Sequence, residues 1–263
     1  EVPIYVTTNG VFVSGDYIEF YGRMADGQLD KQLYDNPLWQ PNDRISMFTD
    51  TAAYFLTADN SGAPLRYTQV PTNIPGSPPP ALQSGMVTVG QYFTNTFSSG
   101  RNVMPNEHIP LSLFDNGEGY VDNMVNVSNQ LARAINTPNL VNSGNATVNL
   151  SVIRNSFSGA PLPVKVHLNN NEIANDQIQQ YETKHFNLTI PAGQLGNANT
   201  VTVTATPTPA PGDNYGLSYL EIIYPRNFDL SGMTFFSFKL AASSASQYLE
   251  MVNFGSGQPA RLY

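Results

Sequence analysis

The feature that most constrains the fold is a series of short runs in which apolar and polar residues alternate. In Thr200–Thr206 the valines and Ala205 occupy one phase and the threonines the other, and in Val164–Leu168 the three aliphatic residues share a phase. Alternation with a period of two places one set of side chains on each face of a β-strand. Strands with one apolar face each are typical of two packed sheets.

Such runs recur through the second half of the chain, separated by Gly, Pro and Asn. The clearest strand-like runs are residues 147–153, 164–168, 186–190, 201–205, 217–224 and 235–240. Helices find little support, although 129–135 is compatible with one or two helical turns. The pattern predicts an all-β protein in which residues 101–242 form a jelly-roll-like antiparallel β-sandwich.

Residues 1–100 are expected to form a smaller β-rich N-terminal unit that packs against the sandwich. Asn9-Gly10 separates strand-like runs, and Asn-Gly is a strong hairpin signal. A second hairpin is expected from residues 52–58 and 65–70. Residues 71–80 contain five prolines and indicate an exposed loop, with a polyproline II docking segment as the alternative. The tail, 243–263, is expected to add a strand and to lead into a missing downstream domain.

Composition excludes several classes of function. The net charge is −8 with only 12 Lys and Arg, so no basic surface is available for nucleic acid. No apolar run approaches the ~18 residues that a transmembrane helix needs, and the first residues do not resemble a signal peptide. The absence of cysteine excludes disulfides, thiol nucleophiles and Cys-ligated metals. No cofactor or metal is predicted.

One stretch near the N-terminus is more specific than its composition. Residues 15–22 read GDYIEFYG, 29–34 read LDKQLY, and 48–56 read FTDTAAYFL; two later landmarks are 214–226 and 260–263. Together they resemble the region upstream of the peptidase domain in gingipain-type (C25) cysteine peptidases of Bacteroidetes, which include the sortase-like signal peptidase of type IX secretion. The resemblance implies a secreted or outer-membrane cell-surface protein whose catalytic Cys and His lie beyond Tyr263.

Several residues are candidates for a binding or catalytic site. Tyr34 and Trp39 are weak candidates for binding a sugar or a partner, because aromatic rings in a proline-flanked loop either stack on ligands or anchor the loop. His108 with Glu107, Asp115 and Glu118 has metal-binding chemistry, but a loop role is preferred. His167 and His185 lie on the polar phase of their strands and are expected to face solvent.

Glu221 is expected to share a face with Tyr219 and to form an ion pair with an arginine such as Arg226. The sequence therefore predicts a non-catalytic accessory region that supports or shields the downstream peptidase domain of the same chain, and that contacts cell-surface proteins or glycans. One alternative is a carbohydrate-binding β-sandwich module. A second is a hydrolase with carboxylates at Glu19, Glu107 or Glu221, which would require a paired-acid cleft.

Overall fold

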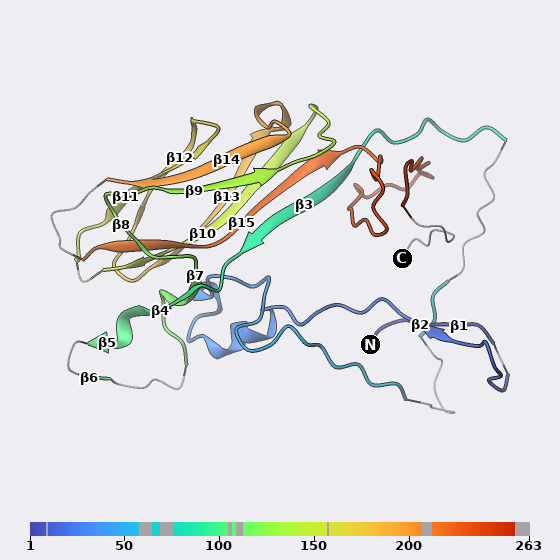
Figure 1. Cartoon of the computed structure of the whole chain (residues 1–263), viewed down its shortest axis with the longest axis horizontal. Coiled ribbons are helices and arrows are strands. Elements are labelled where there is room, and N and C mark those ends of the chain that lie inside the picture. Colours follow the sequence, from blue (N-terminus) through green and yellow to red (C-terminus); the bar gives the residue numbers. More distant parts are fainter. Residues whose placement is uncertain are drawn as a thin grey trace.

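The protein is an all-β chain built around two packed antiparallel sheets (Figure 1). The computed structural model describes residues 1–8, 10–57, 65–68, 76–104, 107–108, 113–156, 158–206 and 212–255. Within these residues the helical elements are short 3-10 turns, and no α-helix is present. The sequence-based prediction of an all-β sandwich is confirmed.

Each sheet has four main strands. The first has the order β13-β10-β15-β3, with the short β8 paired to one end of β15; its members are β3 (Gly85–Tyr92), β8 (Val125–Asn126), β10 (Asn145–Asn155), β13 (Thr183–Pro191) and β15 (Asn214–Arg226). The second has the order β12-β11-β14-β9; its members are β9 (Leu131–Asn136), β11 (Leu162–Leu168), β12 (Asn171–Ile178) and β14 (Ala198–Ala205). All pairings in both sheets are antiparallel.

The chain crosses between the sheets at almost every connection. From β9 to β15 only β11 and β12 are consecutive neighbours in one sheet, joined by a turn in which Asn169 and Asn170 adopt positive φ. Asn tolerates this conformation better than most residues because its short polar side chain bonds locally. This alternation between two sheets gives the jelly-roll-like topology.

The core lies between the two sheets, where the apolar phase of each strand points inward. Val148 and Leu150 of β10 and Leu220 of β15 are fully buried, as are Val164 and Val166 of β11. Burial of each such side chain stabilises the fold by about 1.5–3 kcal/mol. The period-two pattern thus accounts for which face of each strand is covered.

A fully buried ion pair lies at one end of the sandwich. Arg154 of β10 and Asp213, which precedes β15, both have no exposed side-chain surface, and Arg154 Nη2 lies 2.7 Å from Asp213 Oδ2. The same guanidinium donates hydrogen bonds to the carbonyls of Ala160 and Ile178. Arg154 therefore joins the ends of three strands and the connection after β10.

The remaining elements are short and lie outside the sandwich. Two-stranded pairs form between β1 (Tyr5–Val6) and β2 (Ile18–Glu19), β4 (Thr96–Ser99) and β7 (Glu118–Val121), and β5 (Val103–Met104) and β6 (Glu107–His108). The 3-10 turns are η1 (Leu29–Leu33), η2 (Pro37–Trp39), η3 (Gly100–Asn102) and η4 (Ala192–Gln194). Residues 26–47 lie next to β4 and β7 (Figure 1), and part of this segment faces the outer side of the first sheet.

Three local predictions were wrong. Residues 131–136 form β9 rather than a helical turn, because pairing with β14 outweighs weak local helix preference. Strand β12 was not predicted, since its sequence NEIANDQI is mostly polar; it is an edge strand exposed along most of its length. Residues 235–240 form no strand, and only Lys239 makes an isolated bridge, to Met86.

The expected division of the chain near residue 100 falls within a region of close contact. Strand β3 precedes that boundary, yet it pairs with β15 along its whole length, from Gly85 to Tyr92. Residues 52–57 form no strand, and the turn of the expected second hairpin and residues 71–75 of the proline-rich segment lie outside the described residues. In the tail, Tyr248 and Val252 form isolated bridges, to Ala81 and Asp229.

Candidate functional site

Two rows of polar side chains cross the outer face of the first sheet. Strand pairing aligns Asn187 of β13, Asn149 of β10 and Glu221 of β15 in one row. The next row, two residues along each strand, contains His185 and Tyr219 on either side of Ser151, and ends at Tyr92 of β3. The alternation that buries the core therefore also gathers these polar groups on one surface.

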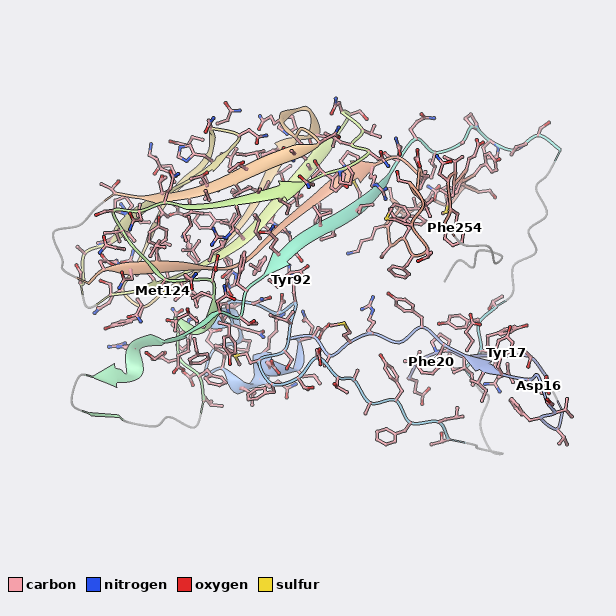
Figure 2. The ribbon with its side chains drawn as sticks, viewed as in Figure 1. Asp16, Tyr17, Phe20, Tyr92, Met124 and Phe254 are labelled. Carbon is pink, nitrogen blue, oxygen red and sulfur yellow. The ribbon has the colours of Figure 1, made fainter. Side chains whose placement is uncertain are left out.

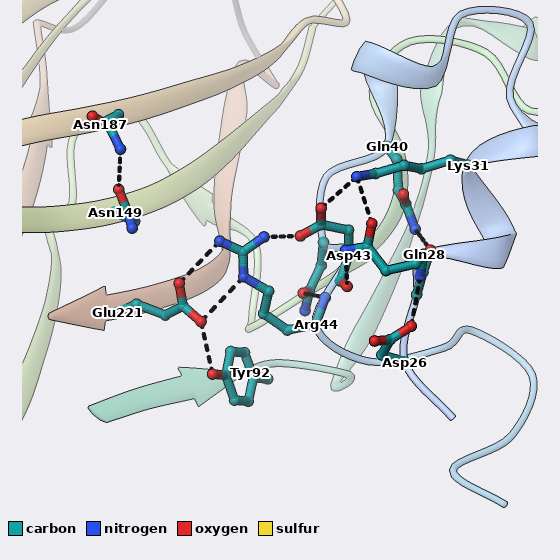
Figure 3. A network of polar contacts seen from close by, with 12 residues as sticks. Asp26, Gln28, Lys31, Gln40, Asp43, Arg44, Tyr92, Asn149, Asn187 and Glu221 are labelled. Atoms are coloured by element: carbon teal, nitrogen blue, oxygen red, sulfur yellow. Dashed lines mark hydrogen bonds and ion pairs between the residues drawn. The ribbon is translucent and has the colours of Figure 1, made fainter. Parts of the chain in front are cut away.

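Glu221 is the centre of a hydrogen-bonded cluster on this face (Figure 3). The residue is 5% exposed, and its carboxylate accepts hydrogen bonds from Arg44 Nε and Nη2 at 3.1 and 3.0 Å. The Tyr92 hydroxyl donates to the same carboxylate at 2.8 Å. Paired N–H···O bonds of this type fix orientation as well as supplying energy. The predicted partner, Arg226, was wrong: it donates instead to the Asp229 carbonyl.

Gly90 makes room for the Tyr92 hydroxyl to reach Glu221. A Cβ at Gly90 would lie 2.6 Å from that hydroxyl and 3.1 Å from Glu221 Cγ. Burial, together with the hydrogen bond to Glu221, raises the pKa of Tyr92 above its usual value. The phenol is therefore a neutral donor to the carboxylate throughout the ordinary pH range.

The cluster continues from the sheet into the loop after η2. Arg44 forms an ion pair with Asp43, whose other oxygen lies 2.6 Å from Lys31 Nζ. Lys31 also donates to the Gln28 side chain at 3.0 Å. The Arg44 guanidinium carbon lies 4.8 Å from the centre of the Tyr219 ring, a distance suited to a cation–π contact. These contacts attach residues 26–47 to the sheet.

A pocket of about 220 Å³ lies between this loop and the sheet. Lys31, Pro37, Leu38, Gln40, Asp43 and Arg44 line it on the loop side. Asn149, His185, Phe186, Asn187 and Tyr219 line it on the sheet side. Small-molecule sites combine a concave shape with a few convergent polar groups. This pocket therefore is the candidate site.

The environment of the pocket favours the neutral forms of His185 and Tyr219. His185 retains contact with solvent, yet the overlying loop desolvates the ring enough to lower its pKa; Arg44 and Lys31 act in the same direction, and hydrogen bonding to the backbone of Leu38 and Gln40 acts against them. Burial raises the pKa of the Tyr219 phenol. An uncharged imidazole and an uncharged phenol both exchange hydrogen bonds with neutral ligands.

The two aromatic residues predicted from the sequence lie near this loop but in different settings. Tyr34 is 3% exposed; its hydroxyl donates to the Glu118 carbonyl at 3.0 Å, and its ring packs against Phe114. Trp39 is half-buried at the end of η2, next to the pocket residues Leu38 and Gln40. Ligand binding by Tyr34 and Trp39 stays a prediction. The pocket residues of the sheet were not predicted, because nothing local marks polar positions that a distant loop will cover.

The other residues that the sequence suggested for metal binding or catalysis lie in separate parts of the structure. Glu107 and His108 form β6, and Glu118 begins β7 after a turn whose Gly117 has positive φ. His167 lies on β11 of the other sheet. Among the described residues, no group of three or more His, Asp or Glu side chains is arranged to hold a metal ion. The described part of the chain also contains no helix with the length and apolar character needed to span a bilayer.

A second feature of the surface is an extended arm with exposed apolar side chains. We define the apolar arm as residues 1–8, 10–25, 48–57 and 65–68, which run side by side away from the sandwich (Figures 1 and 2). Ala25 N donates to the Asp50 carbonyl at 3.0 Å, and the Phe20 and Tyr54 rings lie 5.2 Å apart. No described residue of the arm is buried. Its exposed large apolar residues are Val2, Val11, Phe12, Val13, Tyr17, Phe20, Tyr21, Met24, Phe48, Tyr54, Phe55, Leu56 and Leu65.

Comparisons with known proteins add little. The chain matches no protein-family model and no curated protein. Dimeric latent PorU from Porphyromonas gingivalis is 16% identical, with a TM-score of 0.45, over 65% of this chain and 15% of that chain. The EclA C-terminal domain, a sugar-binding protein, is 12% identical, with a TM-score of 0.29, over 64% and 99%. A family 35 carbohydrate binding module from Clostridium thermocellum is 16% identical, with a TM-score of 0.26, over 35% and 68%. At these identities and TM-scores the likenesses carry no argument about function.

Proposed function

We propose that the chain is a non-catalytic accessory region of a secreted or cell-surface C25-type cysteine peptidase, and that its apolar arm packs against the peptidase domain. The observation that carries this proposal is the arm itself. Val11 and Phe55 are 88% and 89% exposed, and none of the arm residues that the structure describes is buried. Exposed apolar surface on this scale marks an interaction site.

The described part of the arm is ordered by hydrogen bonds and ring contacts between its segments rather than by a buried core, which also favours an external partner. Its strands β1 and β2 are two residues long each, and hydrogen bonds such as Tyr67 N to the Ile4 carbonyl, at 3.2 Å, join its segments. Ordering an extended chain costs about 1–2 kcal/mol per residue in backbone entropy. Burial against a neighbouring domain supplies the apolar contacts that offset this cost.

Two observations favour the peptidase domain as the partner of the apolar arm: the sequence resemblance, and a contact between the arm and the segment that follows the sandwich. The motifs at residues 15–22, 29–34 and 48–56 resemble the region ahead of a C25 peptidase domain, and the first and third lie in the arm. The Tyr21 ring stacks on Phe235 with 6.4 Å between centres, so the arm contacts the segment that follows the sandwich. This contact places the arm against part of the segment that precedes the proposed peptidase domain in the chain.

The proposal is tested by mixing this chain with the separately produced domain encoded after Tyr263 and measuring their association by calorimetry. We expect binding that weakens at least ~10-fold in a Val13→Ser, Phe55→Ser double variant, because central apolar contacts dominate interface energy. Leu29→Ser, which removes an exposed apolar side chain outside the arm, is the matched control. A reading frame without a peptidase domain, or equal affinity of the arm variant and wild type, would refute the proposal.

A further inference from the structure

The pocket under the loop that follows η2 has a recognition chemistry that the accessory role does not use. Its sheet side carries Asn149, His185, Asn187 and Tyr219, from three adjacent strands whose register places all four on one face. We propose that this pocket binds one ring of a neutral saccharide. The proposal is independent of the apolar arm and of any downstream domain.

The two asparagines present a donor and an acceptor side by side. Asn187 Nδ2 donates to Asn149 Oδ1 at 2.7 Å (Figure 3). This bond leaves Asn187 Oδ1 as an acceptor and Asn149 Nδ2 as a donor, and neither has another hydrogen-bond partner in the described part of the chain. An amide acceptor next to an amide donor complements two neighbouring hydroxyl groups of a sugar, since each hydroxyl both donates and accepts.

Other groups around the pocket have unused hydrogen-bonding capacity. Gln40 lines the pocket and is 4% exposed; its Nε2 donates to the Gly27 carbonyl at 2.7 Å, but its Oε1 has no partner among the described residues. Ser151, between His185 and Tyr219 in the same row, also has a buried hydroxyl without a partner there. Buried polar groups are normally satisfied. Both atoms are shielded from solvent, so the side chains that can meet a ligand directly are the exposed ones on the sheet, Asn187 and His185.

The charges of the pocket are compensated within the protein, which favours a neutral ligand. Lys31 and Arg44 are both paired with Asp43, and Arg44 is also paired with Glu221. His185 adds no charge near neutral pH, because its pKa lies below the usual value. An anionic ligand would have to compete with two carboxylates for the same cations.

The size and the remaining wall of the pocket limit the ligand further. A volume of about 220 Å³ is below the ~300–1,000 Å³ of pockets that enclose drug-sized ligands, so one ring fits rather than several. Pro37 and exposed Leu38 supply an apolar wall opposite the asparagines. A sugar ring has an apolar face of C–H groups and a polar rim of hydroxyls, which matches these two walls.

The test is binding of a panel of neutral monosaccharides to this chain, observed by two-dimensional amide NMR with glucuronate and inorganic phosphate as anionic probes. We expect at least one neutral sugar to shift signals of β13 and of residues 37–44. Methyl glycosides and oligosaccharides of that sugar distinguish a free sugar from the end of a glycan chain.

Variants connect the binding to this pocket. Asn187→Ala removes an exposed side chain and is expected to weaken sugar binding about 2- to 13-fold for each hydrogen bond lost. Tyr219→Phe, which removes only the hydroxyl, is expected to weaken it similarly. Asn171→Ala, an exposed asparagine on β12 of the other sheet, is expected to leave binding unchanged. Absence of any neutral-sugar binding, binding of only the anionic probes, or equal affinity of Asn187→Ala and wild type would overturn the proposal.

Discussion

At the scale of single residues, Glu221 determines how the N-terminal half is attached to the sandwich. One carboxylate on β15 accepts hydrogen bonds from Arg44, in the loop, and from Tyr92, on the edge strand β3. These three residues are separated by at least 48 positions in the sequence, from 44 to 92, and by 129 between Tyr92 and Glu221. A buried carboxylate needs such partners because desolvation otherwise disfavours its charge.

Replacing Arg44 by Gln is therefore expected to destabilise the protein by about 1–3 kcal/mol, because it leaves the Glu221 carboxylate buried with one partner fewer. Tyr92→Phe is expected to cost less, about 0.5–1.5 kcal/mol. Urea unfolding monitored by fluorescence measures both values. Lys165→Gln, in the exposed pair with Glu172, is the control and should change stability by under ~1 kcal/mol. An Arg44→Gln effect no larger than that of the control would contradict this account.

A pH dependence follows from His185. Its pKa in the folded chain lies below the unfolded value of about 6.5, because the loop desolvates it and Arg44 and Lys31 lie nearby. Between the two pKa values the unfolded chain binds more protons, so stability falls as the pH is lowered through about 6.5. His185→Gln is expected to reduce this dependence in urea midpoints measured across that window. His167→Gln, on the other sheet, should retain it; an unchanged slope in His185→Gln would refute the assignment.

At the scale of elements, the close packing of the loop after η2 against strand β7 requires a glycine on β7. Gly119 has φ +142°, and a Cβ there would lie 2.4 Å from Pro41 Cγ. Loop residues 26–47 thus approach β7 more closely than a side chain would permit. The same region holds the Tyr34 hydroxyl against the Glu118 carbonyl.

Gly119→Ala is expected to destabilise the protein by about 2–4 kcal/mol, the combined cost of an unfavourable backbone conformation and of a clash with a rigid ring. Thermal and urea unfolding measure the loss. Gly144→Ala separates the backbone cost from the cost of the clash. Gly144 also has positive φ, at +76°, but a Cβ there meets no atom within 4 Å. Equal effects of the two substitutions would show that the contact with Pro41 contributes nothing.

A second prediction at this scale concerns the buried ion pair between Arg154 and Asp213, at one end of the sandwich. Asp213→Asn keeps the shape of the side chain but leaves the fully buried Arg154 guanidinium without its counter-charge. Breaking a buried pair by removing one partner costs about 3–5 kcal/mol. Glu172→Gln, in the exposed pair with Lys165, is the comparison and should cost under ~1 kcal/mol. A loss as small as that of the comparison would mean that Arg154 is held mainly by its carbonyl partners.

The elements that could be predicted from sequence are those whose burial follows from local pattern. Alternation in residues 147–153, 164–168 and 201–205 marked three core strands, because one phase of each is apolar. Edge strand β12 has no such phase, and β9 is defined by its partner β14 rather than by its own residues. Local pattern gives no information about pairing between distant segments.

The candidate site shows the same limit. Glu221 was correctly expected on the face of Tyr219 and to pair with an arginine, since alternation and desolvation require both. Its partner could not be identified, because the approach of Arg44 depends on the path of the whole N-terminal loop. His185 was expected to face solvent, and it is exposed, but nothing in the sequence indicated that a loop about 150 positions earlier in the chain lines one pocket with it.

At the scale of the whole molecule, two regions of very different character meet. The sandwich buries a continuous core of strand residues, whereas the described residues of the apolar arm bury none. Local regions with few buried apolar contacts open with low free energy, so amide protons of the arm should exchange quickly when the chain is alone. Covering the arm with another domain should slow that exchange.

The most direct test of the central claim is hydrogen exchange, measured by mass spectrometry, of residues 11–25 and 48–57 in this chain alone and in the full-length parent. We predict fast exchange of both segments in the isolated chain and protection of both in the parent, with β10 and β15 protected equally in the two. Equally fast exchange of the arm in the full-length protein would contradict the claim that this surface supports a neighbouring domain.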